Sequence, residues 1–224
     1  MADGSPRTDT STDDTDENHR VSPVKLDLRL SQAKVLSLLL LTPVTDPGIN
    51  MEIKRLKGNA AKADVFHVLS GMWKTPAERC FLWLGGFRPS EVLKLLSTQL
   101  EPLTEQQLSG IGNLQQSSQQ AEDALSQGME ALQQSLAETL AGSLSSSGST
   151  GNVANYMGQM AMAMGKLGTI ENFLRQADNL RLQTLQQLQR ILTTRQSARA
   201  FLVISDYSSR LRALSSLWLA RPKE

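Results

Sequence analysis

The glycine–lysine pair near residue 165 is the closest approach in this sequence to a nucleotide-binding motif. A P-loop needs glycine, four residues and then Gly-Lys-Ser/Thr, so that backbone amides surround phosphate and the hydroxyl reaches magnesium. Here six residues separate Gly158 from Gly165, and Leu167 follows Lys166 where the hydroxyl is required. The methionines between the glycines recur at helical spacing. We therefore interpret this segment as helix and expect no nucleotide cofactor.

The single cysteine and one of the two histidines could in principle form a nucleophilic pair. Cys80 lies on the apolar face of its predicted helix, which favours a small buried thiol. His67 stands between Phe66 and Val68 and is typical of a half-exposed helix residue. One cysteine and two histidines also supply too few ligands for a Cys/His metal site. We expect no catalytic residue, no metal, no cofactor and no enzyme activity.

Two groups of apolar side chains are candidates for a partner or ligand surface. They are the aromatic residues Trp73, Phe81, Trp83 and Phe87, and the methionines Met157, Met160 and Met164. Trp73 and Phe81 are expected to build core, whereas Trp83 falls off the apolar face, and an exposed tryptophan often marks an interface. Methionines can line an adaptable groove for a partner or a lipid, but core filling is the interpretation we favour.

Polar side chains offer two further candidate surfaces. A basic docking face for an acidic partner would be formed by Arg195, Arg199, Arg210 and Arg212, although such arginines usually form an ordinary solvated face. A glutamine-rich segment contains Gln106, Gln107, Gln115, Gln116, Gln119, Gln120, Gln133 and Gln134. It is either an uncharged exposed face or a glutamine-rich activation surface.

The elements that must position these residues are predicted to be helices, because apolar residues recur at three and four rather than two. The fold class is all-α, a bundle of long helices. We predict helices over about 60–73, from Pro76 to Gly85-Gly86, over about 89–100, about 104–141, about 157–191, and after Thr193-Thr194. Thr75-Pro76-Ala77-Glu78 has the pattern of a capping box. In the last helix, Leu214 and Trp218 are expected to face inward with Phe201, Ile204 and Leu211.

Charge divides the 224 residues into bands, although the net charge is only +1. Residues 1–20 hold six acids and two bases with few large apolar side chains, which predicts a disordered acidic tail. Residues 101–150 hold six acids and no base, whereas residues 166–224 hold four acids and ten bases. A Gly/Ser linker is predicted near 143–151. No apolar run approaches the length that spans a bilayer, so we expect no membrane association.

Four long motifs resemble the C-terminal region of plant TGA-type basic leucine zipper transcription factors. They are 72–91 (MWKTPAERCFLWLGGFRPSE), 113–130, 155–165 (NYMGQMAMAMG) and 192–218. The resemblance covers about 55–224, and it implies the helical delay-of-germination type domain. It also implies nuclear transcription regulation, binding to TGACG promoter elements as dimers, and partners that are sibling TGA-type factors and ankyrin-repeat coactivators.

The sequence departs from that family between its acidic start and the domain. No basic helix with an Asn-x-x-Ala-Ala-x-x-Ser-Arg core is present, and no leucine heptads follow, so we expect DNA contact only indirectly or weakly. Residues 21–54 are an atypical segment, for which a single helix is the candidate structure. The leading hypothesis is a nuclear transcription regulator that acts through its helical interaction domain. The alternatives are DNA binding retained through a partner, and a hydrophobic small-ligand sensor.

Overall fold

The computed structural model describes residues 55, 58–72, 74–100, 102–145 and 153–222. These residues form helices and turns, and no β-strand is found among them apart from one isolated bridge between Trp83 and Gly86. The all-α prediction is therefore confirmed. The predicted acidic tail, the atypical segment 21–54 and most of the Gly/Ser linker lie outside the described residues.

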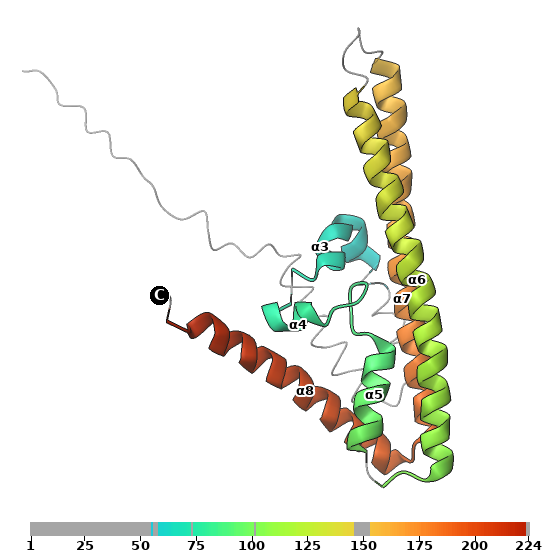
Figure 1. Ribbon diagram of the computed structural model, residues 1–224, viewed down its shortest axis with the longest axis vertical. Helices are drawn as coiled ribbons and strands as arrows, with labels where there is room; N and C mark the ends of the chain where they lie inside the picture. The colour runs from blue at the N-terminus through green and yellow to red at the C-terminus, as the bar shows by residue number, and fades with distance from the viewer. Residues whose placement is uncertain (1–54, 56–57, 73, 101, 146–152, 223–224) are drawn as a thin grey trace, which may run out of the picture.

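Two long helices, α6 (Glu105–Ser145) and α7 (Val153–Ile191), run side by side in opposite directions (Figure 1). Both were predicted, and each is about 60 Å long at 1.5 Å per residue. α6 begins where expected, because the Thr104 amide donates to Gln107 Oε1 at 3.1 Å and the Gln107 amide donates to Thr104 Oγ1 at 3.2 Å. α7 continues without a break through Gly165 and Gly168.

The core consists of two clusters along this pair. The first lies where α3 (Val65–Ser70) meets the middle of the pair and contains Ala60, Ala61, Val65, Val68, Met129, Ile170 and Leu174. The second lies where α5 (Pro89–Gln99) and the start of α8 (Thr194–Ala220) meet the lower end, and it contains Leu93, Leu96, Leu100, Ile111, Leu114, Leu188, Leu192 and Ala200. α5 was predicted almost to the residue. Most of these buried positions recur at spacings of three and four along their helices.

The predicted helix over about 60–73 is broken in the structure. Residues 58–63 are helical, Asp64 is extended, and α3 then begins at Val65 and ends at Gly71 in the left-handed region. Asp64 causes the break because its Oδ1 accepts a hydrogen bond from the His67 amide at 2.8 Å, as an N-cap side chain does. The prediction of one continuous helix was wrong.

The helix that starts at Pro76 is shorter than predicted. α4 spans Pro76–Cys80, so it does not reach Gly85-Gly86. The chain instead makes a tight reversal in which the Trp83 and Gly86 amides each donate to the other's carbonyl, at 2.8 and 3.0 Å. Leu84 and Gly85 both have positive φ, 39° and 70°. Gly85 also packs so closely on Val68 and Leu174 that a Cβ there would lie 3.2–3.4 Å from their atoms. Glycine is therefore needed at position 85 for the turn and for the close packing on Val68 and Leu174, and it does not cap a helix.

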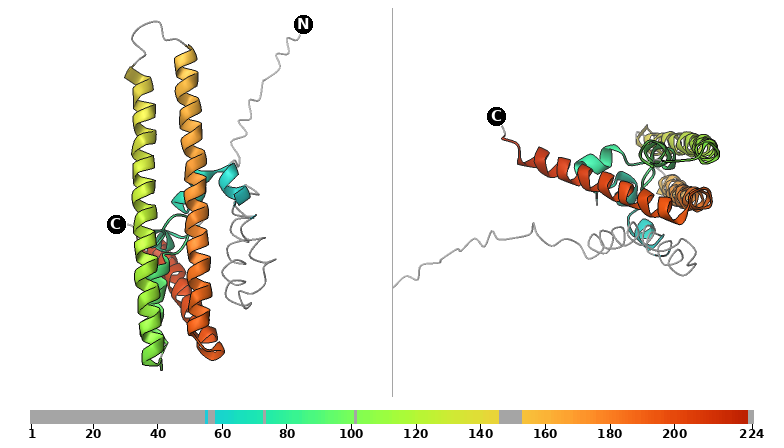
Figure 2. Two further views of the ribbon diagram at one scale, coloured as in Figure 1. Left: turned by 90° about the vertical axis from the view of Figure 1, so that its right-hand side faces the viewer. Right: turned by 90° about the horizontal axis from the view of Figure 1, so that it is seen from below.

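α8 leaves the end of α7 at an acute angle and projects away from the α6–α7 pair, so the molecule has two arms (Figures 1 and 2). Its start is fixed by Thr193, whose Oγ1 accepts from the Gln196 amide at 3.3 Å. Few of the described residues pack against its later part, so Leu214 is 55% exposed and Trp218 is 59% exposed. The prediction that both face inward was wrong.

Candidate interaction surfaces

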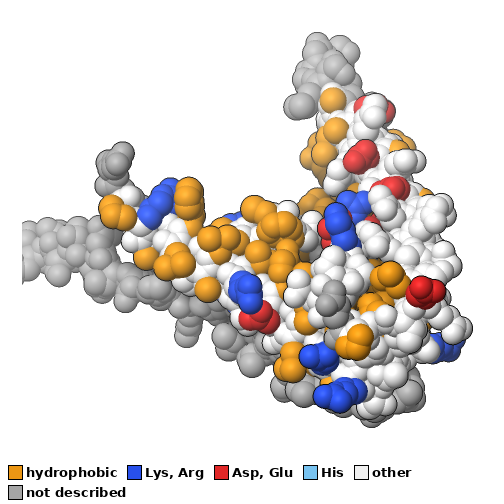
Figure 3. Space-filling model, turned by 60° about the horizontal axis from the view of Figure 1, so that its bottom comes forward, with side chains coloured by type: hydrophobic (Ala, Val, Ile, Leu, Met, Phe, Trp, Pro, Cys, Tyr) orange, Lys and Arg blue, Asp and Glu red, His pale blue; other side chains and the backbone are white. Residues whose placement is uncertain are grey.

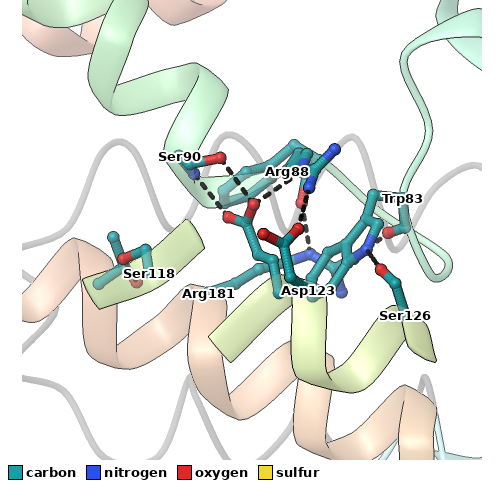
Figure 4. A network of polar contacts seen from close by, with 10 residues as sticks. Trp83, Arg88, Ser90, Ser118, Asp123, Ser126 and Arg181 are labelled. Atoms are coloured by element: carbon teal, nitrogen blue, oxygen red, sulfur yellow. Dashed lines mark hydrogen bonds and ion pairs between the residues drawn. The ribbon is translucent and has the colours of Figure 1, made fainter. Parts of the chain in front are cut away.

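A buried polar network holds α5 and the loop before it onto α6 (Figure 4). Its centre is Glu122 of α6, whose side chain is fully buried. The carboxylate accepts from the Ser90 amide at 2.7 Å, the Ser90 hydroxyl at 2.6 Å and Arg88 Nε at 2.7 Å. Arg88 also donates to Asp123 at 2.9 Å, and its hydrogen bond to Glu122 raises the pKa of the guanidinium. The negative charge of the buried Glu122 carboxylate is therefore compensated by three hydrogen bonds, one of them from a cation.

Arg181 of α7 holds the same loop, between α4 and α5, through its backbone carbonyls. Its Nε donates to the Phe87 carbonyl at 2.7 Å, and its Nη2 donates to the carbonyls of Trp83 and of Leu84, the latter at 2.9 Å. Its Nη1 pairs with Asp178 at 2.6 Å. Burial lowers the pKa of the guanidinium, and the Asp178 carboxylate opposes that shift. One buried cation therefore satisfies three carbonyls of a non-helical segment, which explains why α4 does not continue.

Two of the four candidate aromatics lie in this network. The Arg181 guanidinium is 5.2 Å from the ring centroid of Trp83 and 5.8 Å from that of Phe87. The Trp83 indole also donates to Ser126 at 2.9 Å, and both rings are half-buried. Trp83 and Phe87 thus have structural roles, and their predicted role in a partner surface stays a prediction. Trp73 lies outside the described residues.

Phe81 and Cys80 lie on the surface, against expectation. Phe81 is 58% exposed and meets Tyr207 of α8 edge to face at 6.3 Å between ring centroids. The Cys80 thiol is exposed and lies 3.5 Å from the Pro76 carbonyl. The buried-thiol and Phe81-core predictions were wrong because α4 ends at Cys80 and attaches to α8 largely through its own start. There the Ala77 amide donates to the buried Ser215 hydroxyl at 3.0 Å.

The methionines of α7 are also exposed, so core filling was the wrong interpretation. Met157 is 66%, Met160 40%, Met162 58% and Met164 62% exposed. They lie on the upper half of α7, beyond the cluster around α3. Met164 is 17 residues from Arg181 along α7, or about 25 Å. Among the described residues, the methionines therefore do not share a cleft with Trp83 and Phe87, which lie beside Arg181.

The candidate basic face is spread along α8. Arg195, Arg199, Arg210 and Arg212 are all exposed, but Arg195 and Arg210 are about 22 Å apart along the helix axis. Arg210 pairs with Asp206 at 2.8 Å and Arg212 lies 3.6 Å from Glu78 of α4. Most of the glutamines of α6 are exposed as well, whereas Gln107 is half-buried and joins α6 to Ile191 and Gln196.

The sequence contains a pattern that indicates the buried network, although the predictions above did not include it. Ser118, Glu122 and Ser126 follow one another at intervals of four in α6, within the stripe defined by Leu114 and Met129. A polar run inside an apolar stripe indicates buried groups with partners. Ser118 is indeed buried and lies 3.1 Å from the Thr184 hydroxyl. That Thr184 of α7 is the partner of Ser118 could not be deduced from the sequence without the fold.

Within the residues placed by the structure, no group of three or more His, Cys, Asp or Glu side chains could hold a metal ion. None of the helices described here is long and apolar enough to span a bilayer.

Comparisons with known proteins agree with the resemblance seen in the motifs. The DOG1 family, described as seed dormancy control, matches residues 51–98. The chain is 94% identical over 173 residues to Transcription factor TGA2.3 of Oryza sativa subsp. japonica, a match that covers 77% of this chain and 53% of that protein. It is 83% identical over 174 residues to the TGACG-sequence-specific DNA-binding protein TGA-2.1 of Nicotiana tabacum, covering 77% and 38%. It is 79% identical over 173 residues to Transcription factor TGA2 of Arabidopsis thaliana, covering 77% and 52%. The chain thus spans about half the length of the rice and Arabidopsis relatives, and less of the tobacco one.

Proposed function

We propose that this chain, a relative of the TGA transcription factors that carries a DOG1 domain, regulates transcription in the plant nucleus through its helical domain. The observation that carries the proposal is the 94% identity over 173 residues with a rice transcription factor. At that identity nearly every buried and exposed side chain of the shared region is the same, so its surfaces can serve the same class of contact. These relatives are transcription factors rather than enzymes, and we propose no catalytic role.

In this proposal the domain acts by binding other proteins. It engages sibling TGA-type factors or ankyrin-repeat coactivators at promoters that contain TGACG elements. The exposed apolar residues of α7 and α8 support this mode of action, because exposed apolar patches on a folded domain commonly mark protein interfaces. The network around Arg181 and Glu122 supports it too, since its hydrogen bonds attach the loop between α4 and α5 to both long helices.

A tethering assay in plant protoplasts tests the proposal. The 224-residue chain is fused to a heterologous DNA-binding domain, and a reporter carrying only the matching operator is measured. We expect reporter output to change several-fold in either direction, and a fluorescent fusion to accumulate in the nucleus. Reporter output equal to that of the DNA-binding domain alone, at matched protein level, would contradict the proposal.

A further inference from the structure

Five of the six methionines that the structure describes lie at the surface. Four of them fall within eight consecutive residues of α7, although the whole chain has only eight methionines. Met157 is 66% exposed, Met162 58%, Met164 62% and Met160 40%. We call these four residues the methionine strip. Their thioether groups are concentrated in one place on the surface.

The methionine strip covers the sides of α7 that do not face α6. The contact side is marked by Lys166, whose Nζ donates to the Ser135 carbonyl at 2.6 Å, and by Ala163, which is 5% exposed. At about 100° per residue, Met157 and Met164 lie on the opposite side, and the other two members of the strip lie on the flanks. A polar group of similar size at any of these positions therefore removes little packing between the two long helices.

The other two described methionines are protected in different ways. Met129 of α6 is 4% exposed and belongs to the core cluster with Ile170 and Leu174. Met72 is 57% exposed, but its sulfur accepts a hydrogen bond from Arg79 Nη1 at 3.4 Å. That bond engages a sulfur lone pair, and a lone pair is what an oxidant attacks. Among the described residues, the strip therefore offers the sulfur atoms with the best access for an oxidant.

The other large group of exposed apolar side chains has a different chemistry. Figure 3 shows hydrophobic side chains gathered along α8, and those near its end include Leu214, Leu217 and Trp218. α8 contains no methionine. Mild peroxides oxidise thioethers but leave leucine and tryptophan intact. A mild oxidant can therefore change the polarity of the α7 surface while that of α8 stays the same.

We propose that the methionine strip is a reversible oxidation site. Hydrogen peroxide transfers one oxygen atom to each thioether: a sulfur lone pair forms the S–O bond, the O–O bond breaks, and the remaining oxygen leaves as water. The sulfur thus loses the two electrons that the peroxide gains. A methionine sulfoxide reductase restores the thioether with two thiols, which become a disulfide while the oxygen leaves as water. Because methionine sulfoxide is polar, oxidation converts an apolar surface into a polar one.

The regulatory consequence rests on the proposed function, which assigns the exposed apolar residues of α7 to contacts with other proteins. Such contacts use the apolar, polarizable character of methionine. A sulfoxide oxygen buried in the contact without a hydrogen-bond donor opposes binding. Oxidation of the strip is therefore expected to reduce the effect of this chain on transcription.

Peptide mass spectrometry of the full 224-residue chain tests the site itself. Cys80→Ser is used as the background, because the exposed Cys80 thiol also reacts with peroxide. After timed exposure to hydrogen peroxide, sulfoxide should accumulate first in the strip and more slowly at Met72. It should form at least about tenfold more slowly at Met129, which reacts only when the core opens. The helix content measured by circular dichroism should stay unchanged.

Two variants separate oxidation from packing. The leucine variant carries Met157→Leu, Met160→Leu, Met162→Leu and Met164→Leu, so its strip is apolar and cannot be oxidised. The glutamine variant carries glutamine at the same four positions and mimics the polarity of the sulfoxide. Leucine and glutamine both form helices well and the sites are exposed, so the thermal melts should match that of the parent chain.

Hydrophobic interaction chromatography measures the change in surface polarity. Peroxide should shift the parent chain to earlier elution, close to the glutamine variant, and methionine sulfoxide reductases with dithiothreitol should reverse the shift. The leucine variant should elute at the same position before and after peroxide. Met72→Leu is the matched control, because it removes an exposed methionine outside the strip, and it should shift as the parent chain does.

The tethering assay tests the regulatory consequence. The glutamine variant should reduce the change in reporter output at least about twofold relative to the parent chain, because its strip is polar. The leucine variant should retain the full change. Both comparisons are made at matched protein level.

Three results would overturn the inference. They are oxidation of Met129 as fast as that of the strip, a shift in elution that the reductases do not reverse, and a glutamine variant whose reporter response equals that of the parent chain. The chemical measurements use purified protein and no promoter. If the parent chain itself gives no reporter response, the proposed function is wrong, and mass spectrometry and chromatography still decide whether the oxidation site exists.

Discussion

Arg181 is the residue on which the loop between α4 and α5 depends. Its side chain is 6% exposed and provides donors to the carbonyls of three loop residues. Removing it would take the Arg181 donors from the carbonyls of Leu84 and Phe87, whereas the Trp83 carbonyl would keep the Gly86 amide. A buried carbonyl left without a donor costs about 1–3 kcal/mol. The residue thus converts a segment without regular secondary structure into a fixed part of the core.

Replacing Arg181 by methionine should therefore destabilise the fold by about 3 kcal/mol or more. Urea unfolding followed by circular dichroism measures the loss. Arg175→Met on the same helix is the control, because the Arg175 side chain is 63% exposed and its only described ion pair is with Glu171 at 3.6 Å. That control should change the free energy of unfolding by less than about 0.5 kcal/mol. Equal effects at both positions would contradict the role given to Arg181.

Glu78 links stability to pH. Burial raises the pKa of its carboxyl, but hydrogen bonds from the Thr75 hydroxyl and amide, at 2.7 and 3.0 Å, and the charge of Lys74 together hold it below the usual value. A carboxyl with a lowered folded pKa stabilises the protein above its unfolded pKa, about 4.3, and loses this effect as the pH falls through the folded pKa.

We expect the stability difference between the parent chain and Glu78→Gln to be largest near pH 7 and to shrink as the pH falls below about 4. Urea midpoints at pH 7, 5, 4 and 3 measure it. Glu130→Gln is the control, because it is the same substitution at an exposed site of α6, and its urea midpoints should stay close to those of the parent chain. A difference between parent and Glu78→Gln that stays constant from pH 7 to pH 3 would show that the charge of Glu78 does not stabilise α4.

Side-chain environment was the least predictable feature at this scale. Val68, Ile111 and Leu174 lie on apolar stripes with helical spacing, and all three are buried. Phe81 and Met160 were also assigned to the core, and both are exposed. Helical spacing tells which residues share a face, but whether another element covers that face is decided by contacts distant in sequence.

At the scale of elements, capping chemistry was a reliable guide to helix starts and a poor one to helix ends. Thr75, Thr104 and Thr193 each precede a helix as predicted. Helix starts depend on a side chain three residues away, so the sequence contains the whole interaction. The start of α3 is a local cap by Asp64 that the spacing of apolar residues did not indicate, and the end of α4 depends on Arg181 from α7, which is distant in sequence.

Thr75→Ala tests the start of α4. The substitution removes the hydroxyl that donates to Glu78 and should cost about 1 kcal/mol of stability. Thr169→Ala is the matched control, because Thr169 is exposed inside α7 and its hydroxyl only bonds back to the Gly165 carbonyl at 3.2 Å. Alanine is the better helix former, so the control should be neutral or slightly stabilising. Identical denaturant midpoints for Thr75→Ala and the parent would contradict this account of the cap.

At the scale of the whole molecule, the sequence predicted the fold class and the two long helices but not the divergence of α8. The turn at Thr193 is held by Gln107, whose Nε2 donates to the Ile191 carbonyl at 3.0 Å and to Gln196 Oε1 at 2.8 Å. These contacts join residues about 85 positions apart, and they set the direction of the helix that follows. An amphipathic pattern alone would place α8 flat against the bundle. Trp218 is exposed because the turn directs α8 away from the α6–α7 pair, and this direction cannot be deduced from the residues of α8 alone.

The distribution of charge over the whole molecule leads to a last prediction, about DNA. Major-groove recognition by a basic helix requires arginines and lysines close together on one helix, together with a partner helix that holds it in register. Across the described residues α6 contains no base, and α8 distributes its arginines along its length, with Arg210 paired to Asp206 and Arg212 near Glu78. The net charge of +1 also gives little general attraction to phosphate.

The purified 224-residue chain should therefore bind a TGACG duplex no more tightly than a scrambled duplex of the same composition. Fluorescence anisotropy at about 50 and 200 mM salt measures both affinities, and the salt dependence separates phosphate contacts from base contacts. The tobacco relative, whose name records TGACG-specific binding, is the positive control. Specific binders exceed their non-specific affinity by about 10³ or more. A ratio of that size for this chain would mean that residues outside those described, or α8 itself, read the DNA sequence directly.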